Sequence, residues 1–232
     1  MSEYLSNIEL YFCSSYQELH CSFLITGEEF YHAAKVMRNQ NGEKIYATDG
    51  NGKIFEGIIE NITKDSIEAR IQKTYLYKNE LCNFTFCIPN LKNPDRLKFA
   101  LEKCTELGIT NFILFNSERS LSKNYNVERL NKILLSSMKQ SLRSFMPKIS
   151  VVKSIKEINF VECEVVLFEQ LSTIKIEKSI FRKEQKYLMI FGPEGGLSEK
   201  EIEFINPGIK LNLAENRLRA ETAIIMAASL LQ

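Results

Sequence analysis

Apolar and polar residues alternate in short runs over the first third of the chain. Runs of this kind between turn residues predict β-strands, and we expect five of them, namely LYFCS (10–14), CSFLI (21–25), EKIYATD (43–49), KIFEGIIENI (53–62) and SIEARIQKTY (66–75). A stretch with helical spacing, EEFYHAAKVMR (28–38), interrupts them. Short strands joined by glycine-containing turns indicate a small β-barrel-like module. The polar stretch YLYKNEL (75–81) indicates a linker at its end.

From residue 83 onwards, compact apolar strands alternate with helices. The expected strands are NFTFCI (83–88), NFILFN (111–116), EVVLFEQ (164–170), KYLMIF (186–191) and IKLNL (209–213), and the expected helices cover 93–108, 127–143, 198–205 and 220–232. Asn93 can cap the first helix, Pro94 suits its first position and Gly108 can end it. Ser198 and Glu201 form a capping-box pattern. This alternation predicts an α/β fold with a mainly parallel sheet covered by helices.

The composition is that of an ordinary globular protein, with 232 residues, 44% of them hydrophobic and 25% charged. Such a chain can bury a real core without a disulfide or metal staple. No run approaches the about 18 apolar residues that a membrane span needs. The start, MSEYLSNIEL, lacks the basic and apolar stretches of a signal peptide, so we expect a cytoplasmic protein.

The near-neutral total, 30 Lys and Arg against 29 Asp and Glu, hides a local imbalance. Residues 1–80 carry 8 basic and 12 acidic residues, whereas residues 81–232 carry 22 and 17, with the richest basic segment at 92–153. A basic segment within a neutral protein suits a polyanionic partner. Charge alone, however, favours the simpler interpretation of solvated helix faces.

The rare residues argue against several kinds of site. The two histidines, His20 and His32, both lie in the first third of the chain, and no cysteine forms a CxxC pair or lies at zinc-ligand spacing from a histidine. We therefore expect no metal site and no histidine-dependent triad in the C-terminal part. The cysteines stand mostly in apolar stretches, where we expect buried reduced thiols.

The strongest chemical signal is the turn GPEGG (192–196), which follows an expected strand and precedes a capped helix. In open α/β sheets, ligands bind beyond the carboxyl ends of the strands, and glycines there let the backbone approach a ligand. The turn is neither a Walker loop nor a GxGxxG fingerprint, and a tight turn without a ligand explains the glycines equally well. The next strand leads into LNLAENRLRAET (211–222), so the two loops can form two walls of one pocket.

These two loops carry a family resemblance. GPEGGLSEKEIE (192–203) together with LAENRLRAETA (213–223) resembles the paired signature of the RsmE family, bacterial 16S rRNA methyltransferases of the SPOUT class that methylate uridine at ring nitrogen 3. Further segments are similar to that family in the same order: HAAKVMR (32–38), KNPDRLKFALEKCTELGI (92–109), SERS (117–120) and QSLRSFMP (140–147). The resemblance covers nearly the whole chain, and the pair of C-terminal loops is its specific part.

The resemblance implies a PUA-like RNA-binding β-barrel domain over 1–77 and a SPOUT methyltransferase domain with a deep trefoil knot over 78–232. It implies a homodimer that binds the methyl donor S-adenosylmethionine in the knot, uses no metal and acts on 16S rRNA in the small ribosomal subunit. By position, the donor pocket would be lined by Pro89, Leu91, Glu169, Gln170, Gly192, Glu194, Gly195, Gly196, Leu213, Leu218, Arg219, Glu221 and Thr222.

The sequence also departs from the family pattern. Ala214 stands where glycine is usual, and Ala220 stands where many members have threonine. Lys139 replaces an acid and Leu142 replaces a small residue. The changes at 139 and 142 argue against a catalytic role for that segment, whereas the donor pocket remains recognisable.

The reaction indicates which residues catalysis needs. A sulfonium methyl group is already activated, whereas N3 of uridine becomes a good nucleophile only as its proton leaves and charge spreads to two carbonyl oxygens. We assign catalysis to Arg219, whose guanidinium can orient the uracil or stabilise that charge, and to Glu221. A simple Arg219–Glu221 pair at the helix start is the structural alternative. We expect Glu194 to order its loop rather than act as a base, and His32 to be structural.

Contacts to RNA phosphates are assigned to Arg38, Arg96, Arg119 and Arg143, since such contacts position RNA without specifying a base. The acidic balance of residues 1–80 opposes RNA binding, so the shape of this domain and a local basic patch, or the N-terminal domain of the second subunit, must outweigh the repulsion.

Two alternative functions stay open: another SPOUT methylation, on ribose 2′-oxygen or another base, and a non-catalytic rRNA-binding assembly factor. A nucleotide-binding oxidoreductase is disfavoured because both standard phosphate fingerprints are absent.

Overall fold

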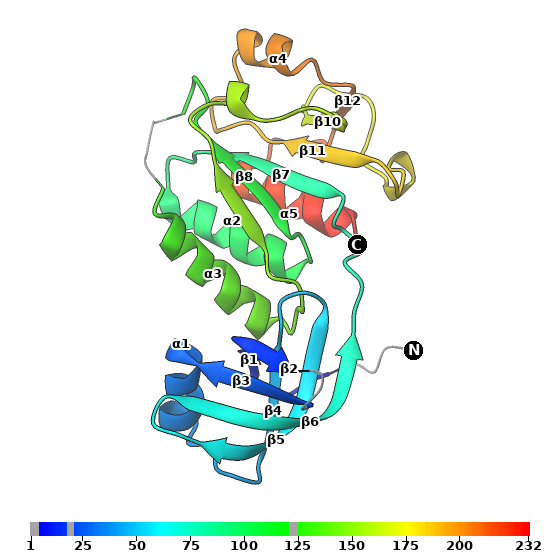
Figure 1. Ribbon diagram of the computed structural model, residues 1–232. Coiled ribbons are helices and arrows are strands. Elements are labelled where there is room, and N and C mark those ends of the chain that lie inside the picture. Colours follow the sequence, from blue (N-terminus) through cyan, green and yellow to red (C-terminus); the bar gives the residue numbers. More distant parts are fainter. Residues whose placement is uncertain (1–4, 18–20, 121–124) are drawn as a thin grey trace. The chain divides into compact units, whose positions relative to one another are not determined.

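The computed structural model describes residues 5–17, 21–120 and 125–232, which form two compact units (Figure 1). The first unit contains the described residues up to Asn79 together with Met138–Met146, and the second contains the described residues of Glu80–Ser137 and Pro147–Gln232. The chain thus leaves the first unit within the expected linker, and a segment from far along the chain belongs to the first unit. Of the residues singled out above, His20 lies outside the described part.

A curled six-stranded sheet forms the first unit, in the order β1-β4-β5-β6-β3-β2. Its strands are β1 (Leu10–Phe12), β2 (Ser15–Gln17), β3 (Ser22–Thr26), β4 (Lys44–Thr48), β5 (Lys53–Ile62) and β6 (Ser66–Leu76). The long β5–β6 pair is irregular at Glu56/Gly57 and at Ile59/Asn61, and such bulges bend a sheet. A Cβ on Gly57 would lie 2.6 Å from Cε1 of Phe23, so the packing inside the curl requires glycine. The expected β-module is confirmed, although the short edge strand β2 was not predicted.

The expected helix over 28–38 is present only in part. α1 (Gly27–Tyr31) passes directly into a π-helical turn (His32–Val36), where the Met37 amide donates to the His32 carbonyl (2.9 Å). The segment ends at Arg38, whose φ of 60° lies in the left-handed region. Arg38 is exposed, whereas Ala33 packs into the core of the first unit.

A parallel six-stranded sheet forms the centre of the second unit, in the order β12-β10-β11-β7-β8-β9. Its strands are β7 (Phe84–Pro89), β8 (Asn111–Phe115), β9 (Lys148–Val151), β10 (Cys163–Phe168), β11 (Lys186–Ile190) and β12 (Ile209–Leu211). The predicted parallel sheet is confirmed. β9 was not predicted, because a run of only four residues, KISV, is too short for its alternation to be distinguished from a loop.

Helices cover both faces of this sheet. In Figure 1, α2 (Pro94–Glu106), α3 (Val127–Gln140) and α5 (Ala220–Leu230) lie on one side, and α4 (Glu199–Ile205) lies on the other. Successive side chains of β7 point to opposite faces of the sheet. Phe86 and Ile88 pack in the core with α2 and α5, and Cys87 packs in the core with α4. Two short 3₁₀ segments, Ile155–Glu157 and Lys178–Ile180, complete the described elements.

The helix ends largely follow their local signals. The Asn93 side chain accepts a hydrogen bond from the Asp95 amide (2.8 Å), and Gly108, just beyond α2, has a φ of 86°. Ser198 and Glu201 form the expected capping box at α4. α3 is the exception, because it ends at Gln140 rather than at residue 143.

The cysteines divide into three groups, since Cys163 is intermediate between buried and exposed. Cys13, Cys87 and Cys104 are buried free thiols, as expected, and burial raises the pKa of Cys13 to about 12. Cys21 and Cys82 are exposed, so the expectation of burial is wrong for these two. Among the described residues, no helix has both the length and the apolar character needed to cross a bilayer.

Candidate active site

A cavity of about 510 Å³ lies where β10, β11 and β12 end. Its wall consists of the last residue of β10, residues that follow the three strands, the start of α5 and one residue of α2: Arg96, Phe168, Glu169, Gln170, Phe191, Gly192, Pro193, Glu194, Gly196, Asn212, Leu213, Ala214, Asn216, Arg217, Leu218, Arg219, Ala220 and Ala223. β11 and β12 are not neighbours, because β10 lies between them. The two loops singled out in the sequence therefore share one cavity with a third strand end.

The glycine turn follows β11 and folds back on itself. The Gly196 amide donates to the Pro193 carbonyl (2.8 Å), and Gly196 has a φ of 70°, a conformation that favours glycine. A Cβ on Gly192 would lie 3.4 Å from Cα of Gly196, so the two ends of the turn are close together. Backbone without side chains thus forms part of the cavity wall.

Side chains from other loops hold this turn. Glu194 Oε1 accepts a hydrogen bond from the Lys92 amide (3.2 Å). Arg119 donates to the Gly195 carbonyl (3.2 Å), and Arg217 donates to the Glu194 carbonyl (3.4 Å). The Glu194 carboxylate therefore takes part in ordering the turn, which is the role expected for it.

Glu201, in the first turn of α4, ties the segment after the glycine turn to the loop after β8. Glu201 is 2% exposed, and its carboxylate accepts hydrogen bonds from Ser117 Oγ (3.0 Å), the Glu118 amide (3.0 Å) and the Ser198 amide (2.8 Å). Sequence reasoning identified Glu201 only as a capping residue. The contact with Ser117 was missed because no local pattern connects residues so far apart in the chain.

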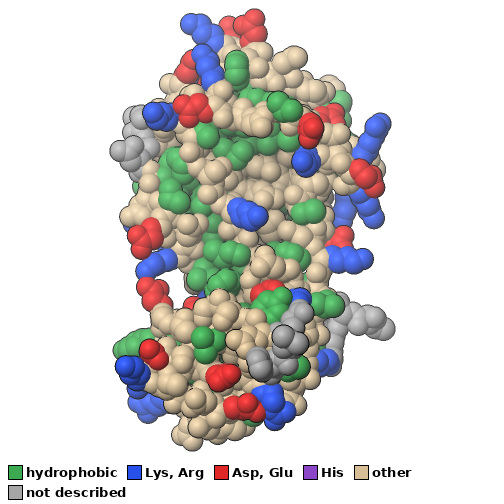
Figure 2. All heavy atoms as spheres, in the orientation of Figure 1, with side chains coloured by type: hydrophobic (Ala, Val, Ile, Leu, Met, Phe, Trp, Pro, Cys, Tyr) green, Lys and Arg blue, Asp and Glu red, His purple; other side chains and the backbone are tan. Residues whose placement is uncertain are grey.

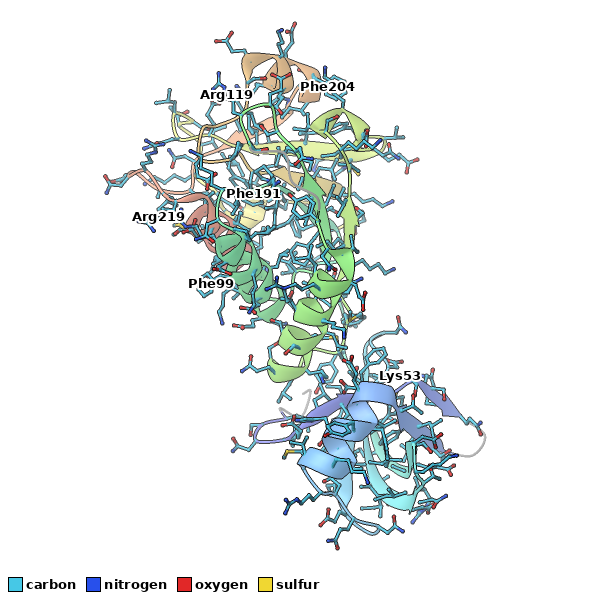
Figure 3. All side chains as sticks on the ribbon, turned by 90° about the vertical axis from the view of Figure 1, so that its left-hand side faces the viewer. Lys53, Phe99, Arg119, Phe191, Phe204 and Arg219 are labelled. Carbon is cyan, nitrogen blue, oxygen red and sulfur yellow. The ribbon has the colours of Figure 1, made fainter. Side chains whose placement is uncertain are left out.

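Three arginines, Arg96, Arg217 and Arg219, line the cavity. Arg96 Nε lies 3.4 Å from Glu221 Oε1. The second oxygen of Glu221, Oε2, is buried and has no hydrogen-bond partner in the described part of the chain. The Arg219 side chain, labelled in Figure 3, is exposed and forms no hydrogen bond or ion pair with another described residue. The partner of Glu221 is thus Arg96 rather than Arg219.

Most residues assigned to the donor pocket line this cavity: Glu169, Gln170, Gly192, Glu194, Gly196, Leu213, Leu218 and Arg219. The other assigned residues lie outside its wall, namely Pro89, Leu91, Gly195, Glu221 and Thr222. Pro89 and Leu91 are buried near the end of β7, whereas Thr222 is exposed. Phe168 and Phe191 were not assigned, although their positions at the ends of β10 and β11 are a signal that could have identified them.

The four arginines assigned to RNA have different surroundings. Arg96 lines the cavity and Arg119 holds the glycine turn, whereas Arg38 is exposed and Arg143 is half-buried in the first unit. On the face that Figure 2 shows, basic and acidic side chains intermingle. Basic side chains therefore do not gather into one patch on that face.

The residues that depart from the family pattern have identifiable surroundings. Ala214 and Ala220 line the cavity. Within the first unit, Lys139 Nζ lies 2.5 Å from Glu29 Oε1, and the other oxygen of Glu29 accepts the Phe12 amide (2.9 Å). Lys139 therefore has a structural partner.

His32 also lies in the first unit, with Nδ1 3.9 Å from Glu9 Oε1 and its ring beside Tyr11 (5.9 Å between centroids). These contacts agree with a structural role. Within the described ranges, no cluster of histidine, cysteine, aspartate and glutamate side chains is suited to holding a metal ion.

The two units define a class of protein. A family model for the RNA methyltransferase domain matches residues 78–232, and a model for the RNA methyltransferase PUA domain matches residues 25–72. The parallel sheet and the cavity at its strand ends lie within the first region, and the second region covers β4, β5 and most of β6 of the curled sheet but not β1 or β2. The chain is thus of the class of RNA methyltransferases with an N-terminal PUA domain.

Relatives narrow this class. Ribosomal RNA small subunit methyltransferase E from Bacillus subtilis is 30% identical over 226 residues, which cover 90% of this chain and 88% of the relative. The protein of that name from Aquifex aeolicus is 25% identical and covers 93% of this chain and 96% of its own. This chain belongs to the ribosomal RNA small subunit methyltransferase E family, which confirms the resemblance found in the sequence.

Solved structures agree on the fold. A probable rRNA-methyltransferase from Porphyromonas gingivalis has a TM-score of 0.79 at 27% identity, and the alignment covers 96% of each chain. The methyltransferase E from Neisseria gonorrhoeae, solved with S-adenosyl methionine, has a TM-score of 0.82 at 23% identity over 96% of each chain. The similarity therefore extends over both units.

Proposed function

We propose that this protein transfers a methyl group from S-adenosylmethionine to ring nitrogen 3 of a uridine in the RNA of the small ribosomal subunit. The observation that carries the proposal is the cavity at the ends of β10, β11 and β12, formed by the glycine turn and by residues 212–220 in a chain of this family. Binding beyond the carboxyl ends of parallel strands is the general rule for open α/β sheets.

The cavity is suited to the methyl donor in size and chemistry. Its volume of about 510 Å³ lies within the range of about 300–1,000 Å³ that is typical of small-molecule sites. Phe168, Phe191 and Leu213 offer apolar surface for the adenine ring, and the backbone of the glycine turn offers groups for its polar edge. Glu169 and Asn212 add polar groups for the ribose and the amino-acid portion. When bound, S-adenosylmethionine supplies a methyl group already activated by a positive sulfonium.

The chain itself must make the uridine nucleophilic. N3 gains an electron pair as its proton leaves, and the negative charge spreads to the flanking carbonyl oxygens. We assign charge stabilisation to Arg219, whose guanidinium is always charged, lies on the cavity wall and is free to face a carbonyl edge. Glu221, assigned to catalysis together with Arg219, lies outside the cavity wall and pairs with Arg96, which supports a positioning role for it.

The fold proposal includes the family's trefoil knot in the second unit. Membership of the methyltransferase E family supports this part of the proposal, since the knot is a property of that family. Such knots are rare in proteins in general. We propose the same domain boundaries as before, 1–77 for the PUA-like domain and 78–232 for the methyltransferase domain.

The proposed assembly is a homodimer. α5 (AETAIIMAASL) is apolar almost all round, yet Leu230 is 39% exposed and Ile225 and Met226 are partly exposed. Phe99, on the adjacent helix α2, is 47% exposed (Figure 3). Exposed apolar surface on an already apolar helix supports packing against a second copy. Analytical ultracentrifugation tests this, and a monomer at micromolar concentration would contradict it.

We propose that Arg38, Arg119 and Arg143 contact RNA phosphates, and that the PUA domain as a whole contributes to RNA binding. All three are at least partly exposed, as phosphate contacts require. A ribosomal RNA substrate would place the activity in the cytoplasm.

The decisive experiment incubates the protein with S-adenosylmethionine labelled in the methyl group and with small subunits that lack the modification. The labelled nucleoside is then identified by chromatography and mass spectrometry. Label in 3-methyluridine is the expected result. Label in a ribose 2′-O-methyl nucleoside or another base would favour the first alternative, another SPOUT methylation. Donor binding that is absent by calorimetry would favour a non-catalytic assembly factor.

A further inference from the structure

Arg96 differs from the other two arginines of the cavity wall because a carboxylate holds it. Its Nε lies 3.4 Å from Glu221 Oε1, and the two side chains are 34% and 12% exposed. Arg217 and Arg219 are both exposed. Arg96 comes from the first turns of α2 and Glu221 from the first turn of α5, so the pair connects two helices beside the cavity.

We propose that Arg96 recognises the substrate base: it donates to a carbonyl oxygen of the target uracil and stabilises the charge that develops there, and Glu221 positions it. This inference rests on the proposed function. It changes the assignment of Arg96 from a phosphate contact to a residue of the reaction site, and it makes Glu221 a positioning residue.

The charge of the pair argues against a phosphate contact. Affinity for phosphates comes from net positive charge and from the release of counterions. At long range the field of Arg96 is offset by the neighbouring Glu221 carboxylate, so Arg96 attracts a polyanion weakly, whereas a group at hydrogen-bond distance still meets its positive charge. The guanidinium nevertheless keeps its planar fork of N–H donors, and apart from Glu221 its side chain has no hydrogen-bond or ion-pair partner among the residues described. Such a group suits a neutral carbonyl that becomes partly negative during the reaction.

The burial of Glu221 favours a fixed Arg96. Because one oxygen of Glu221 is buried without a hydrogen-bond partner in the described chain, its interaction with Arg96 is the charge pairing that compensates for this burial. The positive end of α5 also favours an acid in its first turn. A hydrogen-bond donor such as Arg96 that is held in place before the substrate arrives stabilises developing charge more effectively than one that must first be ordered.

Two of the three cavity arginines can serve the two carbonyl oxygens of uracil, since the third, Arg217, donates to the Glu194 carbonyl. Charge from N3 of uracil spreads to two carbonyl oxygens, one on each side of the nitrogen. Arg96 and Arg219 both line the cavity, so each carbonyl oxygen can receive its own guanidinium. A cation near the anion lowers the pKa of the bound base, and its removal raises that pKa.

The test measures single-turnover methyl transfer to small subunits as a function of pH, for the wild type, Arg96→Gln, Arg96→Lys and Glu221→Gln. We expect Arg96→Gln to slow transfer at neutral pH by about 100-fold. The midpoint of its pH–rate profile should move up by about one unit. Arg96→Lys, which keeps the charge but loses the planar fork, should have a rate between those of the wild type and Arg96→Gln. Glu221→Gln leaves Arg96 charged but no longer held in place, so it should slow transfer by less than Arg96→Gln does and should not raise the midpoint of the profile.

Lys98→Gln is the matched control, because Lys98 is exposed on the same helix, lies outside the cavity wall and pairs with Glu102 (3.6 Å). It removes the same charge from α2 and should leave the pH profile unchanged. Donor affinity, measured by calorimetry, should stay within about twofold of wild type in Arg96→Gln, which shows that the variant is folded and that the donor site is intact.

The outcomes are separable. A wild-type pH profile in Arg96→Gln, or a loss confined to RNA affinity with a reduced salt dependence, would overturn the inference and restore the phosphate contact. A transfer rate of Glu221→Gln identical to wild type would overturn the positioning role. If the wild type itself transfers no methyl group to N3 of uridine, the proposed function fails, and this inference fails with it.

Discussion

Glu201 offers a sharp test of how the cavity is held together. Its carboxylate, 2% exposed, accepts hydrogen bonds from Ser117 Oγ, the Glu118 amide and the Ser198 amide. Glutamine has nearly the same shape but a single acceptor oxygen. If that oxygen takes the place of Oε2, the bonds from Ser117 and Ser198 remain, weakened by the loss of charge, and the Glu118 amide faces an NH₂ group.

The expected cost of Glu201→Gln follows from this geometry. A hydrogen bond to a charged group contributes about 1.5–3 kcal/mol, and a buried donor left without an acceptor costs about 1–3 kcal/mol. One bond lost and two weakened therefore predict a loss of about 2–4 kcal/mol in the free energy of unfolding of the second unit. The weakening should be greatest in the two segments that these contacts join, the loop after β8 and the start of α4.

Hydrogen exchange followed by mass spectrometry, combined with urea denaturation, measures both effects. Exchange should accelerate in peptides that cover 117–120 and 196–202, and the urea midpoint should fall. Glu203→Gln is the control, because Glu203 is exposed on the same helix and should change little. Equal stability and equal exchange in the two variants would refute the argument that Glu201 holds these loops together.

Three further predictions follow from single features. Arg219→Ala should reduce turnover by about 100-fold and donor affinity much less; equal losses in labelling kinetics and calorimetry would contradict our role for Arg219. Leu142 has a φ of 55°, so Leu142→Gly should be more stable to urea than Leu142→Ala by about 1 kcal/mol, the reverse of the usual order. Alkylation of the native protein at pH 8, read by mass spectrometry, should modify Cys21 and Cys82 first, and rapid modification of a thiol buried in the structure would contradict the described packing; the buried thiols are Cys13, Cys87 and Cys104.

Elements with local causes could be predicted from the sequence. The start of α2 depends on Asn93 and Pro94, and the start of α4 depends on Ser198 and Glu201, and both are present as expected. Elements without a strong local signal were missed or misplaced. β9 is a short, exposed edge strand, and the helix expected over 28–38 becomes a π-helical turn partway along.

The candidate site shows the same division. The glycine turn was identifiable because the backbone conformation at Gly196 is a local property of the chain. The surroundings of Arg96 were not identifiable, because its partner Glu221 and the cavity wall come from distant segments. Its assignment to RNA phosphates rested on charge alone, which does not reveal that the half-buried Glu221 carboxylate pairs with it.

The amino-acid sequence by itself determined the two-part organisation, the parallel α/β character of the second part, the family and the two loops that form the cavity. Local rules suffice for the organisation, the α/β character and the loops, because periodicity, caps and glycine turns act over a few residues, whereas the family came from the resemblance of those loops to a known signature. Tertiary structure alone decided that β10 lies between β11 and β12, that Glu201 joins two loops, and that Glu221 pairs with Arg96. Strand order and contacts between distant side chains depend on how the whole sheet assembles, and no short segment of the chain encodes that.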